Sequence, residues 1–118
     1  MEAQCHCRAV RITTPDLPAY LTVCNCSICT KLATRWVYFA PDEVEIDAPQ
    51  DGLSSYVRSD IEPPCLALWR CARCGCVTHW LPIGDTPTDR MGINANLLDP
   101  AAIEGIEVRR VDGRSWPL

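Results

Sequence analysis

The sequence predicts a single, mainly β domain of 118 residues, built of small antiparallel sheets that metal ions crosslink. Two observations support this. Short runs rich in β-branched and aromatic residues alternate with turn residues, which is typical of strands. Seven of the nine cysteines also fall into three tight clusters, which is typical of metal ligation rather than of scattered buried thiols.

The strand segments are bounded by prolines or by Asp and Gly residues. Ten prolines at regular intervals leave little room for long helices, so we expect only a turn or two at residues 27–33 and 100–103. No repeat, charge block or low-complexity stretch marks a second domain, and one domain over residues 1–118 is expected. The expected strands are residues 10–12, 20–23, 36–39, 44–46, 66–69 and 77–80.

The first and last cysteine clusters contain the pairs Cys5/Cys7 and Cys71/Cys74. Two cysteines separated by one or two residues can direct both sulfurs at one ion, whereas a disulfide between such close neighbours is strained. Two such pairs supply the four ligands of a structural zinc site. The alternative is a redox pair formed by Cys71 and Cys74.

The middle cluster supplies three sulfurs, from Cys24, Cys26 and Cys29. Three protein ligands with an open fourth position are typical of a catalytic or substrate-binding zinc site. The sequence therefore predicts a second zinc of a different kind. Cys65 and Cys76 lie outside the pattern; either could close the second site as a fourth ligand, or both could be small buried thiols.

The number and position of the cysteines also indicate the cellular compartment in which the protein is expected. A secreted domain with disulfides is disfavoured because the cysteine count is odd and the first metal-binding pair begins at residue 5, which leaves no room for a targeting segment. No window approaches the roughly 20 apolar residues of a membrane span. We therefore expect a soluble, cytoplasmic protein that does not enter a membrane.

The charge argues against nucleic acid as a partner. The formal net charge is −4, and seven metal-bound thiolates with two Zn²⁺ ions would make it −7. Such an acidic chain is poorly suited to phosphate backbones. The chain has two histidines, His6 and His79, and neither completes the Cys-Cys-His-His pattern of a zinc finger.

The order of the motifs is more specific than any one of them. Cys-His-Cys-x-Ala-Val begins at Cys5, Cys-Asn-Cys-Ser-Ile-Cys-Thr-Lys begins at Cys24, and Cys-x-x-Cys-Gly-Cys-x-Thr-His-Trp begins at Cys71. With the stretch 92–100, this order resembles the glutathione-dependent formaldehyde-activating enzyme family, which includes centromere protein V. The resemblance implies an Mss4-like fold, a structural zinc on the first and last pairs, and a second zinc on the middle triad. It also implies condensation of glutathione with formaldehyde to S-hydroxymethylglutathione, the reaction of a carbon–sulfur lyase run in reverse.

The ligands themselves favour thiol chemistry. Three thiolates on Zn²⁺ leave a net charge of −1 and a weak Lewis acid, which suits holding an incoming thiol as thiolate better than making hydroxide. A small, glutathione-like thiol is therefore the expected partner. The competing function is a zinc-stabilised binding module without chemistry, and recruitment of Cys65 or Cys76 as fourth ligand would favour that function.

Several further side chains are candidates for the site. His79 is the acid–base candidate beside the triad, although a core histidine is the alternative. Arg70 could meet a substrate carboxylate or lie exposed at a strand end. Asn94 and Asn96 resemble the family's asparagine-containing strand beside the pocket, where their amides could hold substrate or cap a turn. Of the four tryptophans, Trp36, Trp69, Trp80 and Trp116, we expect the first and third near the triad.

The sequence departs from the family pattern at three places. Arg8 stands where many members have glycine, and residues 31–33 are bulkier than the glycine that many members carry there. The residues immediately before Cys71, 67–70, also lack the histidine that many members have at that place. These changes concern the surroundings of the two cysteine sites, so they bear on the substrate rather than on the fold.

Overall fold

The structure is a computed structural model that describes residues 1–84 and 89–115. Within these residues the chain forms ten strands, one short α-helix and three short 3₁₀ helices, so the predicted mainly β class is confirmed. The strands are β1 Glu2–Gln4, β2 Arg11–Thr13, β3 Tyr20–Cys24, β4 Trp36–Phe39, β5 Glu45–Asp47, β6 Leu53–Val57, β7 Leu66–Cys71, β8 Val77–Pro82, β9 Met91–Asn94 and β10 Glu107–Val111. The helices are α1 Ser27–Leu32, η1 Pro41–Glu43, η2 Ala95–Leu97 and η3 Gly113–Ser115.

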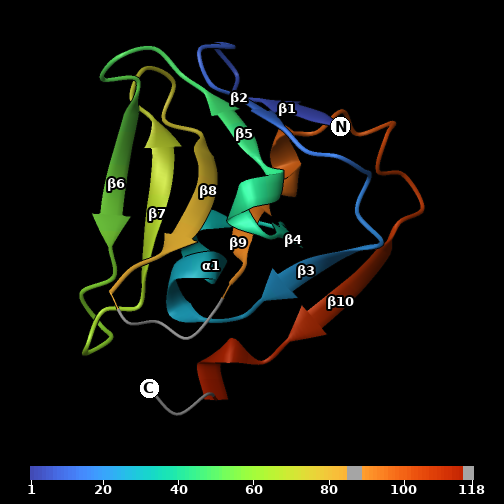
Figure 1. The fold of residues 1–118 in the computed structure, drawn as a ribbon. Helices are drawn as coiled ribbons and strands as arrows, with labels where there is room; N and C mark the ends of the chain where they lie inside the picture. Colours follow the sequence, from blue (N-terminus) through green and yellow to red (C-terminus); the bar gives the residue numbers. More distant parts are fainter. Residues whose placement is uncertain (85–88, 116–118) are drawn as a thin grey trace.

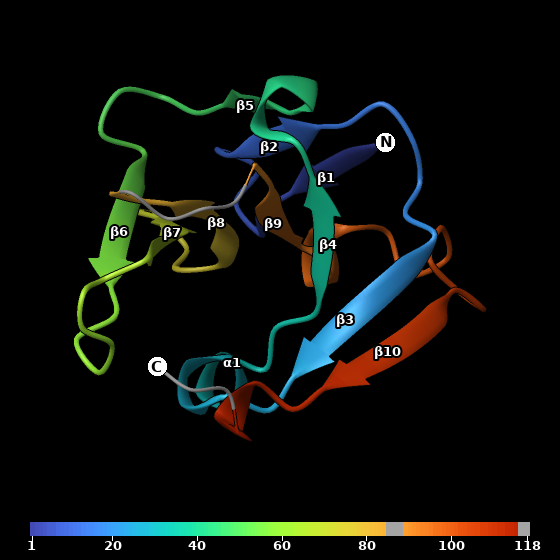
Figure 2. The same cartoon turned by 60° about the horizontal axis from the view of Figure 1, so that its bottom comes forward.

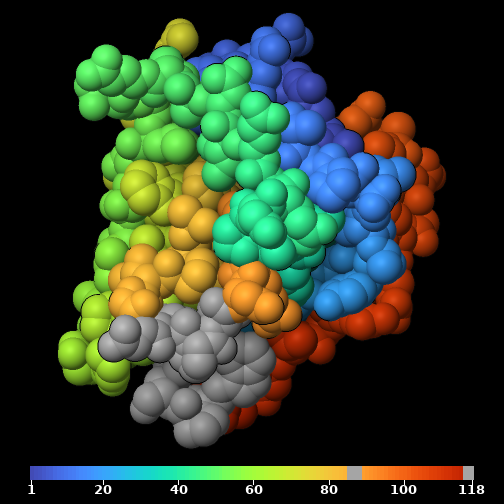
Figure 3. Space-filling view, in the orientation of Figure 1, coloured from blue at the N-terminus to red at the C-terminus, as the bar shows by residue number. Residues whose placement is uncertain are grey.

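The strands form two sheets. A three-stranded antiparallel sheet has the order β1-β2-β5, and a seven-stranded sheet has the order β10-β3-β4-β9-β8-β7-β6. Figure 1 shows the small sheet in the upper part of the molecule, with β3 and β10 of the large sheet below it, and Figure 2 shows β3 and β10 lying side by side. The edge strands β6 and β10 lie on opposite sides of the molecule, as the space-filling view also shows (Figure 3).

Each of the six predicted strands overlaps an observed strand, and the predicted helix at residues 27–33 is α1. The segment 100–103, where we also expected a turn or two, forms hydrogen-bonded turns and no helix. The structure adds β1, β6, β9 and β10, whose sequences carry glycine, serine or charged residues and therefore lack a clear strand signal. The pair β3–β10 is parallel, in contrast to the antiparallel pairing of the other strands described.

One hydrophobic core joins the two sheets. Val10 and Ile12 from the small sheet region pack in the same buried cluster as Leu21, Val37 and Ile93 from the large sheet. Helix α1 buries none of its residues fully and lies at the end of β3, outside this core. Among the described residues, no helix is long and apolar enough to cross a membrane.

A glycine in β9 makes room for a tryptophan from the neighbouring strand. Trp80 in β8 lies opposite Gly92 in β9. A Cβ atom placed on Gly92 would lie 2.0 Å from the indole Nε1 of Trp80, which shows that the indole crosses directly over the glycine backbone. Since Gly92 is buried, a side chain there has no open space to occupy.

We expect Gly92→Ala to destabilise the fold by about 1–3 kcal/mol, because the added methyl group must displace the Trp80 ring. Denaturant unfolding measures the loss, and tryptophan fluorescence reports the ring movement. The matched control is the same substitution in a Trp80→Leu background, where the methyl group meets a smaller side chain. An equal loss of stability in both backgrounds would contradict the steric explanation.

Candidate functional site

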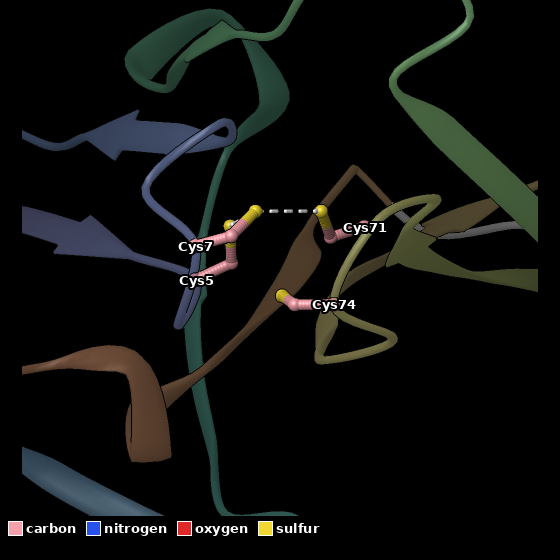
Figure 4. Close-up of side chains that lie close together, drawn as sticks. All are labelled: Cys5, Cys7, Cys71 and Cys74. Carbon is pink, nitrogen blue, oxygen red and sulfur yellow. Dashed lines mark hydrogen bonds between the residues drawn. The ribbon is translucent and has the colours of Figure 1, made fainter.

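The first candidate site brings together Cys5, Cys7, Cys71 and Cys74 (Figure 4). Cys5 and Cys7 lie in the turn between β1 and β2, Cys71 ends β7, and Cys74 lies in the turn before β8. Each turn folds its backbone toward the first cysteine of its pair: the Arg8 N–H donates to the Cys5 carbonyl, and the Gly75 N–H donates to the Cys71 carbonyl, both at 3.0 Å. Arg8 and Gly75 both have positive φ, at 66° and 79°.

The geometry of this quartet fits a tetrahedral zinc. All four sulfurs lie within 4.8 Å of one another, with 3.7 Å between Cys5 and Cys7 and 3.6 Å between Cys7 and Cys71. Four sulfurs at the usual zinc–sulfur distance of about 2.3 Å are about 3.8 Å apart. A metal here would tie the small sheet to the large one.

Two thiols of the quartet, those of Cys5 and Cys74, differ in acidity. Burial raises the pKa of the Cys5 thiol to about 11. Burial acts in the same direction on Cys74, but hydrogen bonds from the backbone of Cys7 and Cys76 and from neighbouring thiols lower its pKa to about 5. The backbone N–H of Val10 also donates to Cys5 Sγ at 3.3 Å, and that of Arg73 donates to Cys71 Sγ at 3.4 Å. Such donors favour the charged form that metal ligation requires.

The second candidate site is the triad Cys24, Cys26 and Cys29, whose sulfurs also lie within 4.8 Å of one another. Cys24 is the last residue of β3, Cys26 immediately precedes α1, and Cys29 lies within it. The turn from strand to helix therefore gathers all three sulfurs. The donor set suits the same metal as the quartet, with three protein ligands in place of four.

Two side chains donate hydrogen bonds to the triad sulfurs. The indole Nε1–H of Trp36 lies 3.3 Å from Cys29 Sγ, and the guanidinium Nη1 of Arg58 lies 3.8 Å from Cys26 Sγ. Arg58 is only 9% exposed and forms an ion pair with Asp60 at 2.8 Å. Arg58 is not predictable from the sequence, because a single arginine in the segment after β6 carries no pattern that links it to the distant cysteines.

The three thiols differ in acidity. Burial raises the pKa of Cys29 to about 12 and also raises that of Cys24. Burial opposes ionisation of Cys26 as well, but hydrogen bonds from the Cys29 backbone and the other two thiols, together with the Arg58 charge, lower its pKa overall. Cys26 is therefore the sulfur of the triad that ionises most readily.

A mainly apolar cavity of about 210 Å³ adjoins the triad. Tyr38 and Trp80 form one part of its wall, with ring centroids 6.1 Å apart in an edge-to-face arrangement, and the Arg90 guanidinium lies 4.1 Å from the centre of the Tyr38 ring. The described residues that line the cavity are Cys24, Cys26, Ile28, Cys29, Trp36, Tyr38, Arg58, Cys65, Leu66, Leu68, Trp80, Arg90 and Val111.

The expected position of Trp36 and Trp80 near the triad is confirmed, since both line this cavity. Cys65 lines it too, but it does not belong to the group of converging sulfurs found among the described residues. Cys76 packs against the hydrophobic core, and its backbone and side chain interact with Cys74. Trp116 lies outside the described residues.

The structure places His79 away from the triad. Successive side chains of a strand point to opposite faces of a sheet, and in β8 Trp80 faces the triad cavity while His79 faces a separate hollow beside Trp69. The His79 ring is parallel to Trp69, with centroids 6.0 Å apart, and its Nδ1 is hydrogen bonded to the Thr78 hydroxyl at 2.8 Å. This position gives no support to the acid–base role that we predicted for His79.

Arg70, Asn94 and Asn96 do not line the triad cavity either. Arg70 is exposed on β7. The buried Asn94 amide donates to the Val77 carbonyl at 2.9 Å, and its oxygen accepts from the Asn96 N–H, which caps η2. Asn96 is exposed and its amide hydrogen bonds with Arg35 and with the Ala33 carbonyl. The two asparagines thus hold backbone segments together, which matches the turn-capping alternative rather than substrate binding.

We expect the two sites to respond differently to the loss of one sulfur. Native mass spectrometry should find about two zinc ions in the wild type and one in either Cys71→Ser or Cys26→Ser. Cys71→Ser should lower the melting temperature by more than about 10 °C, because the quartet joins both sheets, whereas Cys26→Ser should change it little. Equal losses of stability would contradict this division of roles.

The buried His79 predicts a specific pH dependence. Burial lowers its pKa to about 4, from 6.5, so the folded protein holds the neutral ring while the unfolded chain takes up a proton below pH 6.5. Between pH 7.5 and pH 5 the wild type should lose about 2 kcal/mol of unfolding free energy relative to His79→Gln. Denaturant unfolding at both pH values measures this difference, and both proteins share the same zinc ligands. Parallel pH profiles would contradict the prediction.

Comparisons with known proteins bear on both the family and the fold. A family model described as "Glutathione-dependent formaldehyde-activating enzyme" matches residues 1–105. No curated protein matches the chain. The crystal structure of a Rhodobacter sphaeroides protein superposes with a TM-score of 0.71 at 22% sequence identity, covering 92% of this chain and all of the other, which shows a shared fold. Because the family model covers most of the sequence, including all three cysteine clusters, the chain belongs to the glutathione-dependent formaldehyde-activating enzyme family.

Proposed function

We propose that the protein is an enzyme that forms or breaks the carbon–sulfur bond of a thiol adduct, with Cys24, Cys26 and Cys29 as its reaction centre. Glutathione and formaldehyde are the first substrates to consider, because the family is described by them. The observation that carries the proposal is the position of three converging sulfurs in the wall of a mainly apolar cavity. A purely structural metal site has no need of an adjoining cavity.

The triad fits a zinc ion by its donor set and by the convergence of its sulfurs. When bound, zinc would supply a soft positive charge that keeps a substrate thiol in its thiolate form at neutral pH. The quartet of Cys5, Cys7, Cys71 and Cys74 is the proposed structural site, because its four sulfurs leave no position for a substrate.

The protein side chains orient the reactants and exclude water. The aromatic and aliphatic walls of the cavity lower the local dielectric, which strengthens the interactions of a thiolate with nearby N–H groups and cations. The guanidinium groups of Arg58 and Arg90 also line the cavity and offset the negative charge of the sulfurs. Arg70, which we expected to meet a substrate carboxylate, does not line the cavity.

The bond changes of the proposed reaction involve no oxidation or reduction. The substrate thiol releases its proton, its sulfur bonds to the carbonyl carbon, and the π electrons of the carbonyl move to the oxygen, which then takes up a proton. Tyr38 is our candidate for binding that oxygen, because it lines the cavity and burial raises its pKa, which keeps its hydroxyl protonated. The reverse reaction releases thiol and aldehyde.

This chemistry requires a pool of reduced thiols, so a reducing compartment such as the cytoplasm is the proposed location. The second candidate function is a zinc-stabilised binding module. It differs from the enzyme in one measurable respect: it would bind metal at the triad without accelerating any reaction of a thiol.

The test is the rate of exchange between glutathione and its hydroxymethyl adduct. With ¹³C-formaldehyde, exchange NMR should show faster interconversion in the presence of zinc-loaded wild type than in buffer alone. Cys26→Ser should remove this acceleration, since it deletes one of three ligands. The control is His79→Gln, which should keep the rate within about twofold because His79 faces away from the cavity. Zinc-loaded protein that leaves the exchange rate unchanged would favour the binding module.

A further inference from the structure

Two triad sulfurs receive a hydrogen bond from a side chain that comes from another part of the fold. Trp36 on β4 directs its indole N–H at Cys29 Sγ at 3.3 Å, and Arg58, just after β6, directs Nη1 at Cys26 Sγ at 3.8 Å. Neither residue is a neighbour of these cysteines in sequence. Both donors come from outside the strand-to-helix turn that gathers the three sulfurs.

The Arg58 guanidinium is held in one orientation. Its Nε and Nη2 donate to the two carboxylate oxygens of Asp60 at 3.0 and 2.8 Å, and Nη2 also donates to the Ser27 hydroxyl at 3.3 Å. The Ser27 hydroxyl in turn donates to Asp60 at 3.0 Å. This two-point pairing fixes the plane of the guanidinium and leaves Nη1 facing Cys26.

Trp36 is fixed by burial rather than by ion pairing. It is 2% exposed, and its strand pairs with β3 on one side and β9 on the other. The indole therefore has no freedom to turn its N–H away from Cys29. Both donors are built into the fold before any substrate arrives.

A hydrogen bond to a thiolate withdraws electron density from sulfur and occupies a lone pair, so the sulfur attacks electrophiles more slowly. We propose that Trp36 and Arg58 are positioning residues that lower the nucleophilicity of Cys29 and Cys26. As a result, the sulfur of a bound thiol substrate is the one that reacts with the electrophile. This inference rests on the proposed function, because selectivity matters only where a substrate thiolate and the protein thiolates meet the same electrophile.

The inference is tested by alkylating the zinc-loaded protein with iodoacetamide in the absence of glutathione. Each reacting sulfur forms a bond to the methylene carbon and iodide leaves, and mass spectrometry of the peptides gives a rate for each cysteine. In Arg58→Met, Cys26 should react about three- to tenfold faster than in wild type, while Cys29 is unchanged. In Trp36→Phe, Cys29 should react faster by a similar factor, while Cys26 is unchanged.

Matched control variants separate this effect from a general destabilisation of the fold that would expose the cysteines. Trp69→Phe removes an indole N–H that has no hydrogen-bond partner among the described residues, and Arg11→Met removes an exposed guanidinium on β2; neither should change the triad rates. Cys5 and Cys71 serve as internal references in every sample. Equal acceleration of all three triad cysteines, or no acceleration, would overturn the inference.

The test uses two variants, so it still gives a result if one of them misfolds. If Trp36→Phe unfolds, as its thermal melting curve would reveal, Arg58→Met decides the result, with Arg58→Lys as a milder substitution that keeps the charge but loses the two-point pairing with Asp60. Alkylation does not depend on turnover. Failure of the proposed function therefore appears only in the exchange assay with glutathione, and failure of this inference appears only in the alkylation rates.

Discussion

Four cysteine sulfurs converge between the two sheets, and the relative position of the sheets depends on them. Cys5 and Cys7 belong to the small sheet region, and Cys71 and Cys74 to the end of β7 and the turn that follows it. A domain of this size buries a limited core, so a metal held by these four sulfurs would make a large contribution to its stability. Holding this turn fixes β7 and β8, and β8 in turn provides Trp80, part of the wall of the triad cavity.

The alternation of side chains along β8 divides the molecule into two chemical environments. Trp80 extends across Gly92 into the triad cavity, while the adjacent His79 is buried against Trp69 on the opposite face. A neutral, buried histidine suits packing rather than proton transfer at the triad. In the reaction proposed above, the candidate hydroxyl is that of Tyr38, which lies in the described cavity wall.

The two cysteine sites differ in the source of the groups that contact sulfur. In the quartet, the backbone N–H groups of Val10 and Arg73 donate hydrogen bonds to sulfur. The triad adds side-chain donors from β4 and from the segment after β6, so the reactivity of its sulfurs can be adjusted by substitution without altering the turn that positions them. This difference matches a division between a site that holds the fold together and a site that handles a substrate.

The two groups of converging cysteines, the β class and six of the ten described strands could be predicted from the sequence, because cysteine spacing and strand composition are local properties. The family resemblance likewise followed from motif order. The fold shows three placements that the sequence left open: His79 lies on the β8 face away from the triad cavity, Asn94 and Asn96 hold backbone segments, and Arg58 reaches the triad. Those outcomes depend on strand register and on contacts between distant segments. A shift of one residue along a strand reverses the face of every side chain, and composition does not encode that choice.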